Sequence, residues 1–351
     1  MTGRRRWTLA AALAAGLSAG CSYRNAMWSA KRHANDARQL ERHGEAADAR
    51  SQWAQAAAKT RSWRTDEAVV LRAEGLAYSG ACGDAAALIA EARSTTQDVT
   101  RRERIDLADA ECALERDEPG QAEAAVAAPL VSKNDDRRSR AEYVAGRAAA
   151  LHLDFQTATM HFRRSREPGA AGRALVVEQQ GLITRATRRA DLAPIVTELA
   201  RLLRTVSGTA EAGRVLEFLT AVEGISENPA ARFRAAEIAR DSLHAPALAA
   251  ELFLDAASDT ASIYAPKALI AALALLPARH DSLAAILDSR YPTSPYTRVF
   301  HGEPSIAYAA AEDSLARDLG VQGTRNPAIS GSVLFDAPVP GPRGPRLDRP
   351  Q

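Results

Sequence analysis

The chain has 351 residues, of which 46% are hydrophobic but only 5% aromatic, and 45 basic side chains face 43 acidic ones. This near-balance excludes a protein that binds nucleic acid through an overall basic face. Ala, Leu, Arg and Glu predominate, and no run of alternating apolar residues predicts a β-strand. We therefore expect an all-α fold, built either as two average domains or as one elongated array of repeats.

The amino terminus has the layout of a secretory signal. Three arginines, Arg4, Arg5 and Arg6, precede an apolar run, TLAAALAAGL, and small residues then lead to Cys21. The apolar run is too short to span a bilayer, which takes about 20 residues.

The segment LSAGC, which ends at Cys21, resembles the lipobox of bacterial lipoproteins, with Ser18 where that family prefers Leu. The resemblance implies cleavage after Gly20 and acylation of Cys21 with palmitate-type chains. Two or more acyl chains anchor a protein stably without a transmembrane helix. Because Ser22 is not the Asp that retains enteric lipoproteins in the inner membrane, the resemblance implies an outer-membrane anchor that faces the periplasm. The inner membrane and a free periplasmic chain are the alternatives.

Two further cysteines, Cys82 and Cys112, lie about one repeat length apart. In an oxidising periplasm they would pair if neighbouring helical hairpins brought them together. Two free buried cysteines are an equal alternative, and the spacing fits no zinc motif.

Small and large residues recur at a fixed spacing along the chain. The segment RHGEAADARSQWAQA holds Gly44, Ala49, Trp53 and Ala56, a spacing that resembles the turn and second helix of a TPR hairpin. The same ladder recurs after about 36 residues and onwards, at Gly80, Ala85, Ile89 and Ala92, then Ala122 and Val126, then Ala158, Phe162 and Ser165, and later Ala249, Phe253 and Ala256. Gly146 lies in the helix before the fourth copy, where TPRs favour glycine.

Close packing explains such a ladder. Small side chains let two helices approach, and the large residue fills the gap to the next hairpin. Since one hairpin cannot bury its apolar face alone, the period predicts a right-handed α-solenoid of TPR-like hairpins. An irregular helical bundle is the alternative.

The order of segments follows from composition and from apolar residues at three- and four-residue steps. We expect a signal peptide at 1–20, a lipid-anchored linker at 21–30, TPR-like repeats at 31–174, degenerate helical repeats at 175–227, further repeats at 228–320 and a disordered Pro-rich tail at 321–351. In the second half, helices are predicted within 174–186, 193–204, 210–222, 229–243, 247–257, 263–276, 280–292 and 305–319.

Two joints in the carboxyl-terminal half carry a sharper motif. The segments RYPTSPY (290–296) and SIYAPKA (262–268) resemble the YPxSxYA linkers of envelope TPR proteins. That group includes the BamD-like lipoprotein of the outer-membrane barrel-assembly machine and the coordinator of the Tol–Pal system. In such a joint Pro ends one helix, Ser caps the next and Tyr packs across the junction. The array is longer than the barrel-assembly protein, and SIYAPKA lacks the leading Tyr-Pro.

Motifs for chemistry are absent from the sequence. The seven histidines are scattered, and there is no HExxH, GxSxG, GxGxxG or phosphate loop. A soluble lytic transglycosylase, whose family also carries a long helical superhelix, would need a lysozyme-like domain with a Glu-Ser pair after Gly320. We therefore expect no catalytic residue, no metal site, no cofactor and no small-molecule substrate.

We interpret the sequence as a non-enzymatic, lipid-anchored scaffold that binds other envelope proteins or peptide segments. A structural or cell-wall-associated lipoprotein is the alternative, followed by the helical part of a peptidoglycan-processing system. Candidate groove residues on the first helices of the hairpins are Arg72, Tyr78, Glu142, Tyr143 and Arg147. For each of them a solvated helix face is the alternative. Three basic clusters, at 101–104, 137–140 and 185–189, are also interpreted as solvated helix faces.

Overall fold

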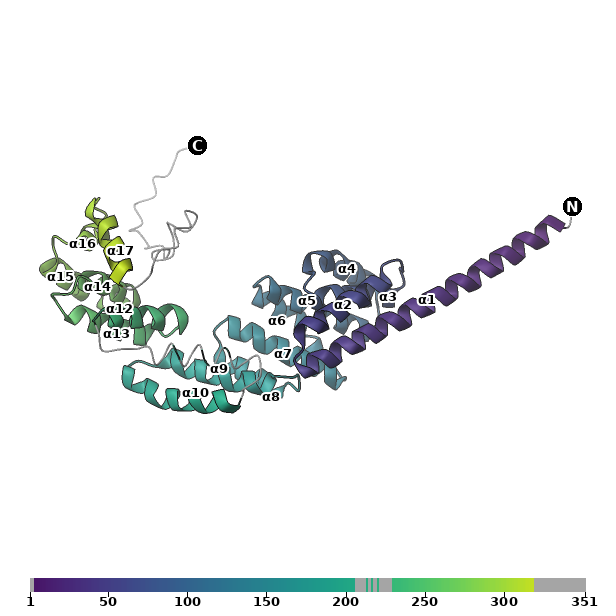
Figure 1. Cartoon of the computed structure of the whole chain (residues 1–351), viewed down its shortest axis with the longest axis horizontal. Coiled ribbons are helices and arrows are strands. Elements are labelled where there is room, and N and C mark those ends of the chain that lie inside the picture. Colours follow the sequence, from purple (N-terminus) through teal and green to yellow (C-terminus); the bar gives the residue numbers. More distant parts are fainter. Residues whose placement is uncertain (1–2, 206–212, 214–215, 217–219, 221–228, 319–351) are drawn as a thin grey trace, which may run out of the picture. The chain divides into compact units, whose positions relative to one another are not determined.

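A computed structural model describes residues 3–205, 213, 216, 220 and 229–318, and within them every secondary-structure element is a helix (Figure 1). The all-α prediction is therefore confirmed for the described residues. The chain divides into unit 1, residues 1–224 with 238–248, and unit 2, residues 225–237 with 249–351. The predicted tail and most of the helix predicted at 210–222 lie outside the described residues.

Unit 1 begins with a long helix and continues through consecutive helices that each pack on the next. Its α-helices are α1 (Gly3–His43), α2 (Ala46–Thr60), α3 (Asp66–Tyr78), α4 (Cys82–Thr95), α5 (Val99–Glu115), α6 (Pro119–Val126), α7 (Asp135–Leu151), α8 (Phe155–Arg164), α9 (Ala170–Arg185) and α10 (Ala193–Thr205). Short turns η1 (Pro129–Val131) and η2 (Arg189–Leu192) and the π-helical turn η3 (Ile238–Ser242) complete it. In addition, α3 packs against α1 and α5, and α5 packs against α7.

The ladder of small and large residues forms the core of unit 1. Trp53 and Phe162 are among its largest fully buried side chains, and the alanines of the ladder are buried beside them. The segment 21–30, which we expected to be a linker, belongs instead to α1. Met27 and Ala30 are buried there, because they begin the apolar face that α1 presents to α2 and α3.

Four turns of unit 1 share one backbone conformation. Gly44, Gly80, Asp117 and Leu153 all have φ between 58° and 88°, and they are 36, 37 and 36 residues apart. In each turn the following residue donates its N–H to the carbonyl five residues earlier, for example Glu45 N to Leu40 O at 2.9 Å. This left-handed ending closes the helices α1, α3, α5 and α7 in the same way.

Leu153 is the residue least suited to such a turn. A side chain in the left-handed region costs about 1–2 kcal/mol, a penalty that glycine avoids. Because the leucine side chain is 46% exposed, its removal sacrifices little burial. We expect Leu153→Gly to raise the free energy of unfolding by about 1 kcal/mol. The reverse substitution at the equivalent turn, Gly80→Ala, should lower it by a similar amount. Urea denaturation would check both, and equal effects of the same sign would contradict the shared conformation.

Two glycines are required by close helix packing. A Cβ on Gly146 of α7 would lie 2.9 Å from the ring of Phe162 in α8. A Cβ on Gly75 of α3 would lie 2.7 Å from the carbonyl oxygen of Trp53 in α2. The helices α3 and α7 therefore approach the large residue of the ladder, Trp53 in α2 and Phe162 in α8, through a glycine.

Unit 2 packs shorter helices around an aromatic core. They are α12 (Pro229–Glu237), α13 (Pro246–Ser258, of which Ala249 onwards belongs to this unit), α14 (Ala265–Leu275), η4 (Pro277–Arg279), α15 (His280–Arg290), α16 (Pro295–Phe300) and α17 (Ala307–Asp318). Phe233 contacts Phe253 and Tyr264 with ring centroids 5.5 and 5.8 Å apart. Lys267 is buried beside them and pairs with Glu312 of α17 at 2.7 Å.

The two YPxSxYA-like joints differ in geometry. In RYPTSPY, α15 ends at Arg290, and the Ser294 side chain caps α16 by accepting a hydrogen bond from Tyr296 N, as predicted. Tyr296 is buried and packs edge-on against Tyr308. In SIYAPKA, Pro266 lies in the first turn of α14, within the helix predicted at 263–276, and so it begins a helix.

Within the described part of the chain, no single helix is both long and apolar enough to cross a bilayer. The segments Ala265–Leu275 and Pro277–Arg290 reach the required length and composition only when taken together, with a bend of 118° between them.

Candidate functional site

Two adjoining cavities of unit 1 are lined mainly by α1, α3, α5 and α7. The larger has a volume of about 640 Å³ and the smaller about 300 Å³. Five residues line both of them: Glu41, Tyr78, Arg140, Glu167 and Pro168. The cavities therefore form one continuous site, called here the Arg–Glu cavity.

Helix capping fixes the position of the arginines in this site. Asp98 caps α5 by accepting a hydrogen bond from Arg101 N at 2.8 Å, and Asn134 caps α7 by accepting one from Arg137 N at 2.9 Å. The caps are 36 residues apart, so α5 and α7 start in the same phase of the repeat. Arg104 and Arg140 follow Arg101 and Arg137 by one helical turn. Arg104 therefore faces α3, and Arg140 faces α5.

The first set of ion pairs joins α5 to α3. Arg104 donates to Glu74 at 2.8 and 2.5 Å and to Glu67 at 3.0 Å. Arg101 donates to Glu67 at 3.3 Å. Lys31 of α1 lies 3.7 Å from the same carboxylate, so Glu67 is shared between α1, α3 and α5.

A second set repeats this arrangement one period later, between α7 and α5. Arg137 donates to Glu103 at 2.5 Å, and Arg140 lies 2.8 Å from Glu111. Arg147 approaches the other oxygen of Glu111 at 2.5 Å. The sequence separations of the first two pairs, 34 and 29 residues, nearly equal the 34 and 30 residues of Arg101–Glu67 and Arg104–Glu74. The ion pairs therefore follow the same repeat as the core.

Arg140 is the centre of the second set. Besides Glu111, its guanidinium reaches Glu167 at 3.2 Å and Glu41 at 3.6 Å, and it lies 5.2 Å above the ring of Tyr78. These partners belong to α5, the segment before α9, the end of α1 and the end of α3. One side chain thus connects four separate elements around the cavity, a role suited to the planar fork of arginine.

Burial and charge oppose each other at Glu111. Burial by itself raises the pKa of this carboxyl, but the charges of Arg140 and Arg147 outweigh it and hold the pKa below its usual 4.5. Glu67 behaves in the same way, because Arg104 overcomes the effect of burial and lowers its pKa. At Glu167 burial prevails over the charge of Arg140, and the pKa is raised.

These shifts predict a dependence of stability on pH. A carboxylate with a lowered folded pKa stabilises the fold above its unfolded value near 4.5. That contribution is lost as the pH falls through the lowered value. Glu167 has the opposite sign, because its raised pKa favours the folded state when it is protonated. With two lowered groups against one raised, we expect unit 1 to lose stability as the pH falls below 4.5.

Urea denaturation at about pH 7 and about pH 3.5 would measure this loss. Glu111→Gln should make the difference between the two conditions smaller. The control Glu178→Gln alters an exposed carboxylate on α9 that pairs only with Arg163 among the described ion pairs. Its pH dependence should match that of the unmodified chain, and an equal loss of pH dependence in both variants would contradict the assignment to Glu111.

The predicted groove residues fall into two groups. Tyr78, Tyr143 and Arg147 line the smaller cavity. Arg72 lines neither cavity, because it turns toward the loop after α2 and donates to the carbonyl of Arg61 at 2.8 Å. Glu142 also lines neither, since it contacts His161 of α8 at 2.6 Å.

The interpretation of two basic clusters as solvated helix faces was wrong. At 101–104 and 137–140, arginines bind carboxylates of the preceding repeat and line the cavity. Sequence reasoning overlooked the most connected residues, Arg104, Arg140 and Glu111. A signal was nevertheless present, because the pattern Arg-x-x-Arg occurs twice with the 36-residue spacing of the core ladder. The third cluster does leave Arg185 and Arg188 exposed.

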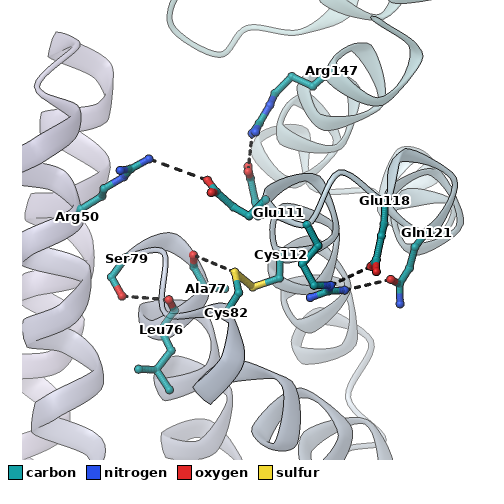
Figure 2. The surroundings of a disulfide bond; sticks show 12 residues. Arg50, Leu76, Ala77, Ser79, Cys82, Glu111, Cys112, Glu118, Gln121 and Arg147 are labelled. Carbon is teal, nitrogen blue, oxygen red and sulfur yellow. Dashed lines mark hydrogen bonds and ion pairs between the residues drawn. A yellow bond between two sulfur atoms is a disulfide. The ribbon is translucent and has the colours of Figure 1, made fainter. Parts of the chain in front are cut away.

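A disulfide lies directly behind this site. Cys82, at the start of α4, is bonded to Cys112 of α5, and both are buried. Cys112 follows Glu111, so the bond holds α5 in place next to the carboxylate that receives Arg140 and Arg147. Figure 2 shows the disulfide close to Glu111, whose carboxylate meets Arg147.

No group of three or more His, Cys, Asp or Glu side chains among the described residues is arranged to hold a metal ion. The chain matches no protein-family model, no curated protein and no solved structure.

Proposed function

We propose that this chain is a non-enzymatic scaffold, tethered to an envelope membrane by a lipid on Cys21, that binds an acidic segment of a partner protein in the Arg–Glu cavity. The observation that carries the proposal is the repetition of one ion-pair arrangement along successive helices of unit 1. In this proposal the helices form a solenoid of TPR-like hairpins, whose first helices line the binding surface.

The helix contacts support the solenoid. Consecutive helices pack in order from α1 to α9, and α1, α3, α5 and α7 also contact one another in sequence. The left-handed turns and the core ladder both recur every 36 or 37 residues. Such regularity is expected of stacked hairpins and is not required of an irregular bundle.

The charge of the cavity supports an acidic partner. Ten basic and seven acidic side chains line its two parts. The acidic ones are largely engaged by arginines of neighbouring helices, whereas Arg42 is exposed and forms no ion pair with any described residue. Arg166 is exposed too, and its only described ion pair is with Asp135 at 3.6 Å. The opening therefore presents cations that an incoming carboxylate can reach.

Binding of a fluorescein-labelled decaglutamate peptide, followed by anisotropy, tests the cavity. We expect salt-sensitive binding that weakens about tenfold when Arg42 and Arg166 are both replaced by Glu, because two reachable cations become repulsive. The matched control is Arg164→Glu with Arg185→Glu, which reverses two exposed charges that line neither cavity. Equal binding by the two variants would overturn the proposed site.

The natural partner can be sought with one position from the site and one from the control pair. A photo-crosslinking amino acid at position 42 should capture acidic segments in intact cells, and one at position 164 should not. Mass spectrometry of the mature amino terminus tests the anchor separately, because an intact Gly20–Cys21 bond is incompatible with lipidation at Cys21.

A further inference from the structure

Helix α1 exposes an aromatic side chain between two arginines near the start of the part that packs against α2 and α3. Trp28 is 62% exposed, although a tryptophan normally buries most of its surface. Arg24 and Arg32 lie four residues before and after it, on the same helical face. The guanidinium of Arg32 lies 5.7 Å above the Trp28 ring. This face points away from the side of α1 that carries the buried Met27 and Ala30.

The loop between α2 and α3 lies next to the same turns. The hydroxyl of Tyr23 is 2.9 Å from Thr65 Oγ1, and its ring contacts Trp63 at 5.0 Å in an edge-on arrangement. The loop carries two further arginines, Arg61 and Arg64, which are exposed. These two segments lie at the same end of the packed part of unit 1 and carry three arginines and two tryptophans, with Trp63 on the Tyr23 side of α1 and Trp28 on the opposite side. We call this end of unit 1, with Arg24, Trp28, Arg61, Trp63 and Arg64, the basic end.

The arginines of the basic end have no carboxylate partner. Arg24, Arg61 and Arg64 form no ion pair with any described residue. The carboxylates that follow the loop, Asp66 and Glu67, are paired with cations of α5. The surface is therefore cationic, and it combines that charge with exposed or half-exposed indole rings.

Position 21 lies in α1 seven residues before Trp28, which is close to two helical turns, or about 10.5 Å along the axis. Tryptophan is enriched where a membrane meets water, and arginines near an anionic surface are attracted to its headgroups. We infer that the basic end lies against the headgroups of anionic phospholipids and so orients unit 1 on the membrane. The inference rests on the proposed lipid anchor at Cys21 for its location, and it concerns a separate surface from the Arg–Glu cavity.

Quenching of Trp28 fluorescence tests this contact. The full lipoprotein would be reconstituted in vesicles of phosphatidylethanolamine and phosphatidylglycerol, with or without bromine on the upper part of the acyl chains. Subtracting the signal of Trp28→Phe isolates Trp28 from the other tryptophans. We expect bromine to quench the Trp28 signal, and high salt or replacement of phosphatidylglycerol by phosphatidylcholine to relieve the quenching.

Neutral variants test the arginines. Replacing Arg24, Arg61 and Arg64 by Gln should lower the ratio of membrane-contacting to detached orientations by about fivefold per arginine. The matched control replaces Lys133, Arg164 and Arg185 by Gln, which removes the same charge from exposed positions elsewhere in unit 1. It should leave the quenching unchanged.

The outcomes separate this inference from the anchor. A lipidated chain whose Trp28 is not quenched in anionic vesicles, or is quenched equally in zwitterionic ones, would overturn the basic end and leave the anchor intact. An intact Gly20–Cys21 bond would overturn the anchor. In that case the full chain can be added to preformed vesicles, where quenching of Trp28 by brominated anionic lipid supports the basic end and its absence overturns it.

Discussion

Replacing Arg140 by methionine is expected to lower the free energy of unfolding of unit 1 by about 3 kcal/mol. Removing one partner of a buried ion pair typically costs about 3–5 kcal/mol, because the remaining charge is left without compensation. Here Glu41 and Glu167 would lose their contacts with Arg140, and Glu111 would keep only Arg147. The side chain of Arg140 retains 21% exposure, so solvent screens part of the effect, and the lower end of the range applies.

Urea denaturation followed by tryptophan fluorescence measures this loss in unit 1 alone, because all four tryptophans of the chain lie there. The matched control is Arg163→Met on α8, whose partner Glu178 is also exposed. Exposed pairs of this kind contribute about 0–1 kcal/mol. Adding Glu111→Gln to Arg140→Met should restore part of the stability, since the buried charge of Glu111 then has only Arg147 to compensate it. If the Arg140 and Arg163 variants were equally stable, the central role of Arg140 would be excluded.

Arg140 also shows the difference between a stabilising contact and a binding contact. It lines both parts of the cavity, and it also forms ion pairs with Glu41, Glu111 and Glu167 that hold the fold together. Its removal should therefore alter binding and folding together. Arg42 and Arg166 are better probes of binding, because their charges can be reversed without breaking a buried network.

The helical core was predictable because packing leaves a periodic trace in the sequence. Ala49, Trp53 and Ala56 must be small, large and small for α2 to fit against its neighbours, and the same constraint acts one period later. The turns were only half predictable. Gly44 and Gly80 reveal their left-handed backbone through the absence of a side chain, whereas leucine at position 153 gives no such sign.

The candidate site was harder to predict, because its contacts depend on how α1, α3, α5 and α7 pack on one another. Arg101 and Arg104 looked like a solvated cluster when their own helix was considered alone. Only the superposition of repeats places them opposite Glu67 and Glu74. The contact of Arg140 with Glu41 joins residues 99 positions apart, and no local pattern predicts it.

The extent of α1 was misjudged for a different reason. The expected linker at 21–30 contains Tyr23, Met27 and Ala30, which pack against α2 and the loop after it. Its position directly after Cys21 favoured a linker, whereas the four- and three-residue steps between Tyr23, Met27 and Ala30 indicate one face of a helix. Its burial means that a lipid on Cys21 would attach almost directly to the folded unit, with no flexible spacer between them.

Reducing the disulfide between Cys82 and Cys112 is expected to destabilise unit 1 by about 3–4 kcal/mol. The bond closes a loop with a sequence separation of 30, and the lost restriction of the unfolded chain accounts for a penalty of this size. The double variant Cys82→Ala with Cys112→Ala should lie within about 1 kcal/mol of the reduced chain, since only two small buried side chains are then changed. Urea denaturation with and without dithiothreitol measures all three states.

The same bond should affect binding, because Cys112 adjoins Glu111, which lines the smaller part of the Arg–Glu cavity. A looser α5 would displace the carboxylate that meets Arg140 and Arg147. Reduction should therefore weaken decaglutamate binding under conditions where unit 1 remains folded, whereas Leu153→Gly, far from the disulfide in sequence, should not. Unchanged denaturation midpoints on reduction would refute the stabilising role. A normal midpoint shift with unchanged peptide binding would instead separate the disulfide from the site and confine its effect to the fold.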